Sequence, residues 1–177
     1  MNYTNNIFGN IHYTPEDGTY TDPTPIVING RPSDCNLHIF EDQYFAQAKL
    51  SSALEQLNQL EVLDQLAREA FLQRYQQADD VVADFVHDHF EYSDETTQEI
   101  AQTLGTTDRN YMLFLDKIEL GSVSLANSAS LEDKGAGTYE ITLDYSLIWV
   151  GGISFTDQIL VARFDQDNQL LQVAHES

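Results

Sequence analysis

The stretch Leu60–Arg68, LEVLDQLAR, decides the fold, because it lies inside a long segment with the composition and the period of helices. Residues 41–104 contain neither glycine nor proline and are rich in Glu, Gln, Ala and Leu, which are good helix formers. Apolar residues recur here mostly at spacings of three and four, the period of a helix. The period slips near residues 59–61, and acidic starts follow at Asp80 and Asp94, so the segment predicts three to four helices.

The segments on both sides of this helical block favour strands. Ahead of it, the β-branched run Ile26–Arg31, IVINGR, contains Asn-Gly, the strongest short hairpin signal, and predicts a hairpin over residues 25–40. A short strand is also expected over residues 7–13. Beyond the helical block, alternating apolar residues predict further strands. These lie over residues 111–120, 123–125, 138–150, 158–164 and 169–174, with a turn at 165–168.

The order of strands, helices and strands is typical of an α+β protein. We expect one domain over residues 1–177, with an extended zone at 1–40, a helical zone at 41–104 and a strand-rich zone at 105–177. In this fold a mainly antiparallel sheet, built from the N-terminal hairpin and the C-terminal strands, carries the helices on one face.

The net charge limits the classes of partner. The 177 residues include 29 Asp and Glu against 8 Lys and Arg, which gives a formal charge of −21. So few basic residues argue against binding to nucleic acid phosphates or to an anionic membrane surface. The N-terminus shows no basic, apolar signal sequence, and the one cysteine permits no internal disulfide. These features favour the cytoplasm.

Negative charge is densest in the helical zone, where no Lys or Arg occurs between Gln76 and Asp108. One interpretation is a solvated acidic face that maintains solubility. The other is a surface that binds a basic protein partner and accelerates their encounter. The candidate partner-binding residues are Asp80, Asp84, Asp88, Glu91, Asp94 and Glu95.

Signs of catalysis are few, and we predict no catalytic residue, no cofactor and no metal ligand. The sequence lacks glycine-rich phosphate loops and the Gly-x-Ser-x-Gly elbow. Cys35 follows Asp34, which would raise a thiol pKa, and this favours a structural strand residue over a nucleophile.

Two alternatives stay open. A metal-dependent enzyme or sensor could use His87, Asp88 and Glu91, since residues 87 and 91 lie one helical turn apart. His87 and His89 are two residues apart and point in different directions on a helix, which favours histidines that cap a helix C-terminus. The second alternative is a structural protein that forms oligomers through an exposed sheet edge.

Two further stretches carry a family resemblance. They are the helical segment Val82–Glu91, VADFVHDHFE, and the terminal hairpin Gln158–Ser177. Together with Leu60–Arg68 and the Ile28–Gly30 turn, they resemble a bacterial family known only as a domain of unknown function, number two thousand and four in that series. The resemblance implies the same order of elements and no established activity. Size and acidity are also similar to those of immunity proteins that inhibit bacterial toxins, an analogy that implies a basic protein as the partner.

Overall fold

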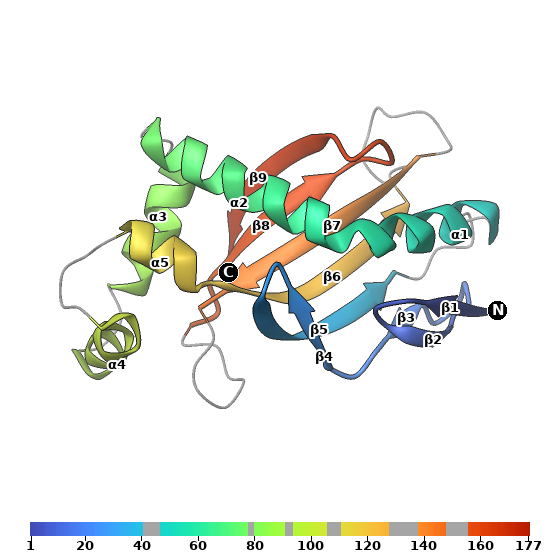
Figure 1. Ribbon diagram of the computed structural model, residues 1–177, viewed down its shortest axis with the longest axis horizontal. Helices are drawn as coiled ribbons and strands as arrows, with labels where there is room; N and C mark the ends of the chain where they lie inside the picture. The colour runs from blue at the N-terminus through green and yellow to red at the C-terminus, as the bar shows by residue number, and fades with distance from the viewer. Residues whose placement is uncertain (41–46, 78–79, 91–93, 106–110, 128–137, 148–155) are drawn as a thin grey trace.

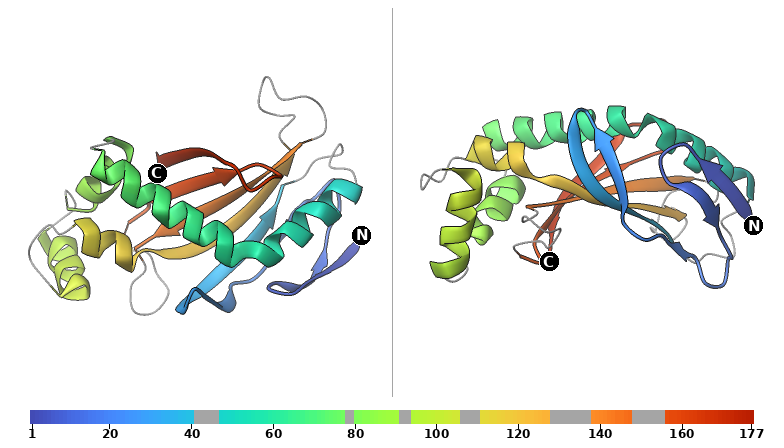
Figure 2. Two further views of the ribbon diagram at one scale, coloured as in Figure 1. Left: turned by 45° about the horizontal axis from the view of Figure 1, so that its top comes forward. Right: turned by 60° about the horizontal axis from the view of Figure 1, so that its bottom comes forward.

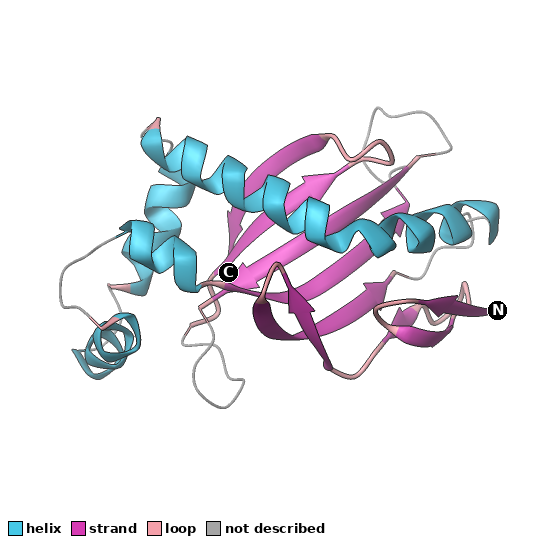
Figure 3. Ribbon diagram, in the orientation of Figure 1, coloured by secondary structure: helices cyan, strands magenta, loops and turns pink. Residues whose placement is uncertain are grey.

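A seven-stranded mixed sheet forms the centre of the computed structural model (Figures 1 and 3). The structure describes residues 1–40, 47–77, 80–90, 94–105, 111–127, 138–147 and 156–177. Its strands are β3 (Thr19–Tyr20), β4 (Thr24–Ile28), β5 (Arg31–Ile39), β6 (Glu119–Asn127), β7 (Tyr139–Ser146), β8 (Ile159–Phe164) and β9 (Leu170–Glu176).

The strand order is β3-β5-β6-β7-β8-β9, and β4 also pairs with β5. All pairs are antiparallel except β5–β6, which is parallel. A parallel pair needs a long crossover connection, and the whole helical block supplies it here. The predicted α+β class with a mainly antiparallel sheet is therefore confirmed.

The predicted hairpin over residues 25–40 is present as β4 and β5, in which Ile28 pairs with Arg31 across the turn. Asn29 and Gly30 at its tip have φ of 50° and 77°. A two-residue turn with positive φ at both positions matches the right-handed twist of the strands, which explains the Asn-Gly pair.

The described residues of the helical block form four helices and one short 3-10 turn. These elements are α1 (Gln47–Gln56), η1 (Leu57–Gln59), α2 (Leu60–Gln76), α3 (Asp80–His89) and α4 (Asp94–Leu104). The turn at residues 57–59 interrupts the helices next to the period slip predicted near residues 59–61. Helices α1 and α2 cross one face of the sheet, whereas α3 and α4 lie at one end of it (Figure 2).

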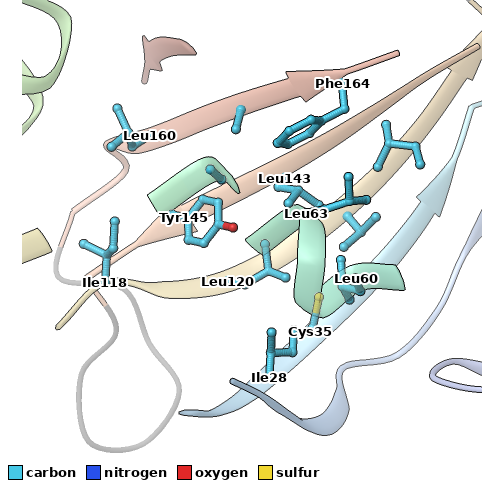
Figure 4. Close-up of a cluster of buried hydrophobic side chains, with 14 of the residues drawn as sticks. Ile28, Cys35, Leu60, Leu63, Ile118, Leu120, Leu143, Tyr145, Leu160 and Phe164 are labelled. Carbon is cyan, nitrogen blue, oxygen red and sulfur yellow. The ribbon is translucent and has the colours of Figure 1, made fainter. Parts of the chain in front are cut away.

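The core lies between α2 and the sheet, where Leu60 and Leu63 meet strand residues such as Leu120, Leu143 and Phe164 (Figure 4). Val62 and Leu66 are also apolar residues of this helix, but their exposed fractions are 49% and 37%. The buried side is instead completed by Asp64, Ala67 and Phe71. Burial of Leu60, Leu63, Ala67 and Phe71 at helical spacing sets this phase.

The strand expected over residues 111–120 is wrong at its start. Residues Tyr111–Lys117 form the helix α5, and β6 begins at Glu119. Apolar residues fill both parities of this segment, so alternation does not fix its structure. Contact with α3 favours the helix, because the buried ring of Phe114 packs edge-on against Phe85 with 5.7 Å between the ring centroids.

The N-terminus forms a separate two-stranded sheet of β1 (Asn2–Asn5) and β2 (Gly9–His12), so the expected strand over residues 7–13 begins later than predicted. Asn5 fastens it to α1 and η1 by donating from Nδ2 to the Leu54 carbonyl at 2.7 Å and to Asn58 at 3.3 Å.

The C-terminal strands agree with the sequence: β8 and β9 form a hairpin around residues 165–168, and β7 ends at Ser146. Residues 148–150 of the expected strand lie outside the described residues. Within the described ranges, no helix combines the length and apolar character that a membrane crossing requires.

Candidate partner-binding surface

Helix α3 carries the core of the predicted acidic surface. Its buried side consists of Val82, Phe85, Val86 and His89, and it packs against β9, α2, α5 and β8. This packing leaves the opposite side of the helix for polar residues. Asp84 and His87 are exposed there, and the side chain of Asp88 is 43% exposed.

The six predicted partner-binding residues fall into three groups. Asp84 and Asp88 lie one turn apart on α3 with accessible carboxylates. Asp80 begins α3, and Asp94 and Glu95 lie in the first turn of α4, but the structure describes only their backbone. Glu91 lies outside the described residues. Two carboxylates of the surface are therefore placed in full.

Part of the scarce positive charge is already bound within the chain. Among the residues that the structure describes, Arg31, Arg68 and Arg163 form ion pairs with acidic side chains. Their partners are Asp116 at 2.7 Å, Asp64 at 2.9 Å and Glu176 at 2.6 Å. None of these arginines neutralises the acidic residues of α3.

The two histidines of α3 have opposite environments, as their spacing predicts. His87 is exposed, whereas the ring of His89 is fully buried. Nδ1 of His89 donates to the Phe85 carbonyl at 2.7 Å, and Nε2 accepts from the hydroxyl of Thr156 at 3.0 Å. That hydroxyl in turn accepts from the backbone N–H of Gln158. His89 thus links α3 to the segment before β8.

Burial lowers the pKa of His89, against the effects of the Phe85 hydrogen bond, Asp88 and Asp157, which raise it. Desolvation outweighs them because the ring is enclosed, with the rings of Phe85 and Phe114 packed edge-on at 4.7 and 4.8 Å. His89 is therefore neutral near pH 7.

The described residues do not provide a set of ligands for the metal site considered as an alternative. The described part of the chain contains no cluster of three or more His, Cys, Asp or Glu side chains placed to hold a metal ion. Of the three residues considered, Glu91 lies outside the described residues, and Asp88 approaches His175, with 3.8 Å between Oδ2 and Nε2.

Cys35 is a buried residue of β5, as the sequence predicts. Its thiol pKa is raised to about 12, first by burial and then by Asp144. Asp34, the neighbour expected to raise this pKa, is exposed, because neighbouring strand residues point to opposite faces of a sheet. Such a thiol is a poor nucleophile.

A buried polar cluster connects α2 with the sheet, and its carboxylate was not predicted. Asp64 accepts from Asn29 Nδ2 at 2.9 Å, Arg68 Nε at 2.9 Å and the Tyr145 hydroxyl at 3.0 Å. Arg68 also donates to the Ile118 carbonyl at 3.1 Å and lies 5.2 Å from the centroid of the Tyr145 ring. The spacing of four between Asp64 and Arg68 is the signal that could have revealed the pair.

The sheet face opposite α2, here called the far face, is mainly polar. By strand, its residues are Asn36 and His38; Ser122 and Ser124; Glu140, Thr142 and Asp144; Val161 and Arg163; and Gln172, Ala174 and Glu176. Asp144 lies in the middle and accepts from the Ser122 hydroxyl at 2.5 Å. Burial raises its pKa, and this outweighs the hydrogen bond from Ser122, which lowers it.

No family model, curated protein or solved structure matches this chain. The resemblance to the bacterial family of unknown function therefore stays a prediction. The chemistry of the described surfaces is the remaining guide to function.

Proposed function

We propose that this protein is a non-enzymatic binding protein that engages a basic protein partner through the acidic helices α3 and α4. The observation that carries the proposal is the outward placement of Asp84 and Asp88 on α3 in a chain of net charge −21. A narrower form of the proposal, suggested by size and charge, is an immunity-type inhibitor of a toxin.

The placement of the positive charges supports this proposal. Arg31, Arg68 and Arg163 have acidic partners within the chain, so they do not reduce the field at α3. Excess carboxylates on one surface raise the local concentration of a cationic protein and increase the association rate. Salt screens this attraction over about 8–10 Å at physiological ionic strength.

Reversal of charge on α3 tests the proposal. The partners to try are the basic proteins encoded by the neighbouring genes, with association rates measured by surface plasmon resonance at low and high salt. We expect the pair Asp84→Lys and Asp88→Lys to slow association several-fold at low salt and much less at high salt.

The matched control makes the same change of charge elsewhere. Glu55 on α1 and Asp167 in the β8–β9 turn are both exposed. Glu55→Lys with Asp167→Lys should alter the association rate much less than the α3 pair. Equal effects of the two pairs of substitutions on the association rate would indicate only a general dependence on net charge. An unchanged association rate for the α3 pair would rule out α3 as the binding surface.

Self-association is a second candidate function, favoured by the edge of the sheet. β9 is the outermost strand, and Leu170 and Leu171 on it have exposed fractions of 36% and 37%. An edge strand with exposed apolar residues can pair with a second copy. Analytical ultracentrifugation at high protein concentration tests this, and a monomer throughout would exclude it.

A further inference from the structure

A second surface, far from α3, presents aromatic rings to solvent. Tyr20 on β3 has an exposed fraction of 65%, and Phe40, directly after β5, has one of 43%. Half-buried His38 lies against both rings, with centroids 5.9 Å from Tyr20 and 4.2 Å from Phe40. We call Tyr20, His38 and Phe40 the aromatic patch.

The three rings lie on one face by strand geometry. Tyr20 pairs directly with His38 across β3 and β5, so their side chains point the same way. Phe40 follows His38 by two residues, which returns it to the same face. This is the far face, because the alternate residues Leu37 and Ile39 are fully buried on the helix side.

The backbone beneath the aromatic patch is fixed by hydrogen bonds. Phe40 donates its N–H to the Leu125 carbonyl at 3.1 Å. Next to Tyr20, the N–H of Thr21 donates to the Leu37 carbonyl at 2.9 Å, and the Thr21 hydroxyl accepts from the N–H of Leu37 at 2.9 Å. The backbone that carries the rings is thus fixed before any ligand arrives, which lowers the entropic cost of binding.

Exposed carboxylates lie in the strands and turns that carry the aromatic patch, close to its residues in sequence. Glu16 and Asp17 precede β3, Asp22 follows it, and Asp34 lies on β5. The one basic residue among residues 1–40 is Arg31, and both of its terminal nitrogens bind Asp116. Residues 1–40, which include all three rings, therefore carry a net negative charge.

Electron-rich ring faces beside carboxylates are complementary to the side chains of Arg and Lys. A cation over an aromatic ring gains electrostatic attraction from the ring quadrupole, and the nearby carboxylates add to it. We infer that the aromatic patch is a docking surface for an arginine- or lysine-bearing segment of a basic protein. The inference shares with the proposed function only the positive charge of the partner.

This surface is separate from the acidic helices. Figures 1 and 2 place β3 at one end of the molecule and α3 and α4 at the other. Binding to each surface can therefore be measured independently in the same experiment.

The test is an NMR titration of the full-length protein with a synthetic peptide, acetyl-(Gly-Arg)4-amide. We expect the largest chemical-shift changes in the ring signals of Tyr20, His38 and Phe40. The same peptide with citrulline in place of arginine is the control for charge, because citrulline keeps the planar group without the positive charge. Comparable affinity for the citrulline peptide would overturn the inference.

Variants provide a second measurement. The pair Tyr20→Ala and Phe40→Ala should weaken peptide binding at least about fivefold. Val27→Ala is the matched control, because Val27 is an exposed apolar residue (67%) on neighbouring β4 and carries no ring. Circular dichroism verifies that each variant is folded. An affinity in the Tyr20/Phe40 variant equal to that of the Val27 variant would overturn the inference.

The location of the shifts separates this inference from the proposed function. Shifts confined to α3 and α4 would overturn the aromatic patch and support the acidic helices. Shifts at the aromatic patch alone would support the inference and count against the helices. No binding at either place would contradict both.

Discussion

Asp64 and Arg68 form an ion pair inside the protein, one turn apart on α2, with 2.9 Å between Oδ1 and Nε. The side chain of Asp64 is 1% exposed and that of Arg68 17%. The pair joins the helix to Tyr145 on β7 and, through Asn29, to the tip of the β4–β5 hairpin. It therefore holds three parts of the fold in register.

We predict that Arg68→Met destabilises the protein strongly, because it leaves the buried carboxylate of Asp64 without its cation. The loss of one partner of a buried pair costs about 3–5 kcal/mol in the free energy of unfolding. Urea denaturation followed by circular dichroism measures this change.

The exposed pair of Arg31 and Asp116 supplies the control. Their side chains are 38% and 57% exposed, and pairs in water contribute at most about 1 kcal/mol. Arg31→Met should therefore cost far less than Arg68→Met. Replacement of both partners, Asp64→Leu with Arg68→Met, should recover part of the lost stability, because no unpaired charge remains. The double variant also removes the buried Nη1 of Arg68, which lacks a hydrogen-bond partner among the described residues. A double variant less stable than Arg68→Met would contradict this account.

His89 makes stability depend on pH. Its ordinary pKa of 6.5 holds in the unfolded chain and is lowered in the fold, so the unfolded state binds more protons between the two values. Stability from this group is therefore complete above pH 6.5 and falls as the pH decreases toward the lowered pKa. His175 on β9 acts in the same direction as burial, whereas Asp88 and Asp157 oppose it.

His89→Gln isolates this effect. The difference in the free energy of unfolding between the wild-type protein and the variant should shrink as the pH decreases from 7 to 5, at up to about 1.4 kcal/mol per pH unit. His87→Gln is the control on the same helix, because His87 is exposed. A difference for His89→Gln that stays constant over this range would contradict the proposed neutral, buried ring.

Asp144 acts in the opposite direction on the far face. Because burial raises its pKa, the folded state binds more protons than the unfolded state between the two pKa values. Its contribution to stability is greatest at acid pH and decreases as the pH rises through the raised pKa.

Asp144→Asn should consequently increase the free energy of unfolding at pH 7, because the asparagine can still accept from Ser122 and carries no charge to desolvate. The gain should disappear near pH 3, where the aspartate is protonated in both states. Asp34→Asn is the control, since Asp34 is an exposed carboxylate on β5. Equal stabilisation by both variants would show that the gain in stability arises from the change in net charge alone.

The sequence predicts those parts of the fold in which local signals and tertiary packing agree. Asn29-Gly30 specifies its turn by backbone conformation, and the period slip near residues 59–61 marks the break between α1 and α2 to within about two residues. Prediction from the sequence fails where tertiary packing determines the structure. Phe114 belongs to a helix because of its contact with Phe85. Asp64 is buried because Arg68, Asn29 and Tyr145 donate hydrogen bonds to its oxygens. The aromatic patch was also missed, because it depends on the pairing of β3 with β5 across residues far apart in the chain.

Cys35 should resist modification in the folded protein. The thiolate is the reactive species, and with a pKa of about 12 and a fully buried side chain, almost none forms at neutral pH. Ellman's reagent at pH 8 should therefore react with the native protein at least about a hundredfold more slowly than with protein unfolded in guanidinium chloride. The unfolded sample is the internal control, because it contains the same thiol at its ordinary pKa. Reaction at similar rates in both states would place Cys35 in contact with solvent and contradict the packing of β5 beneath α2.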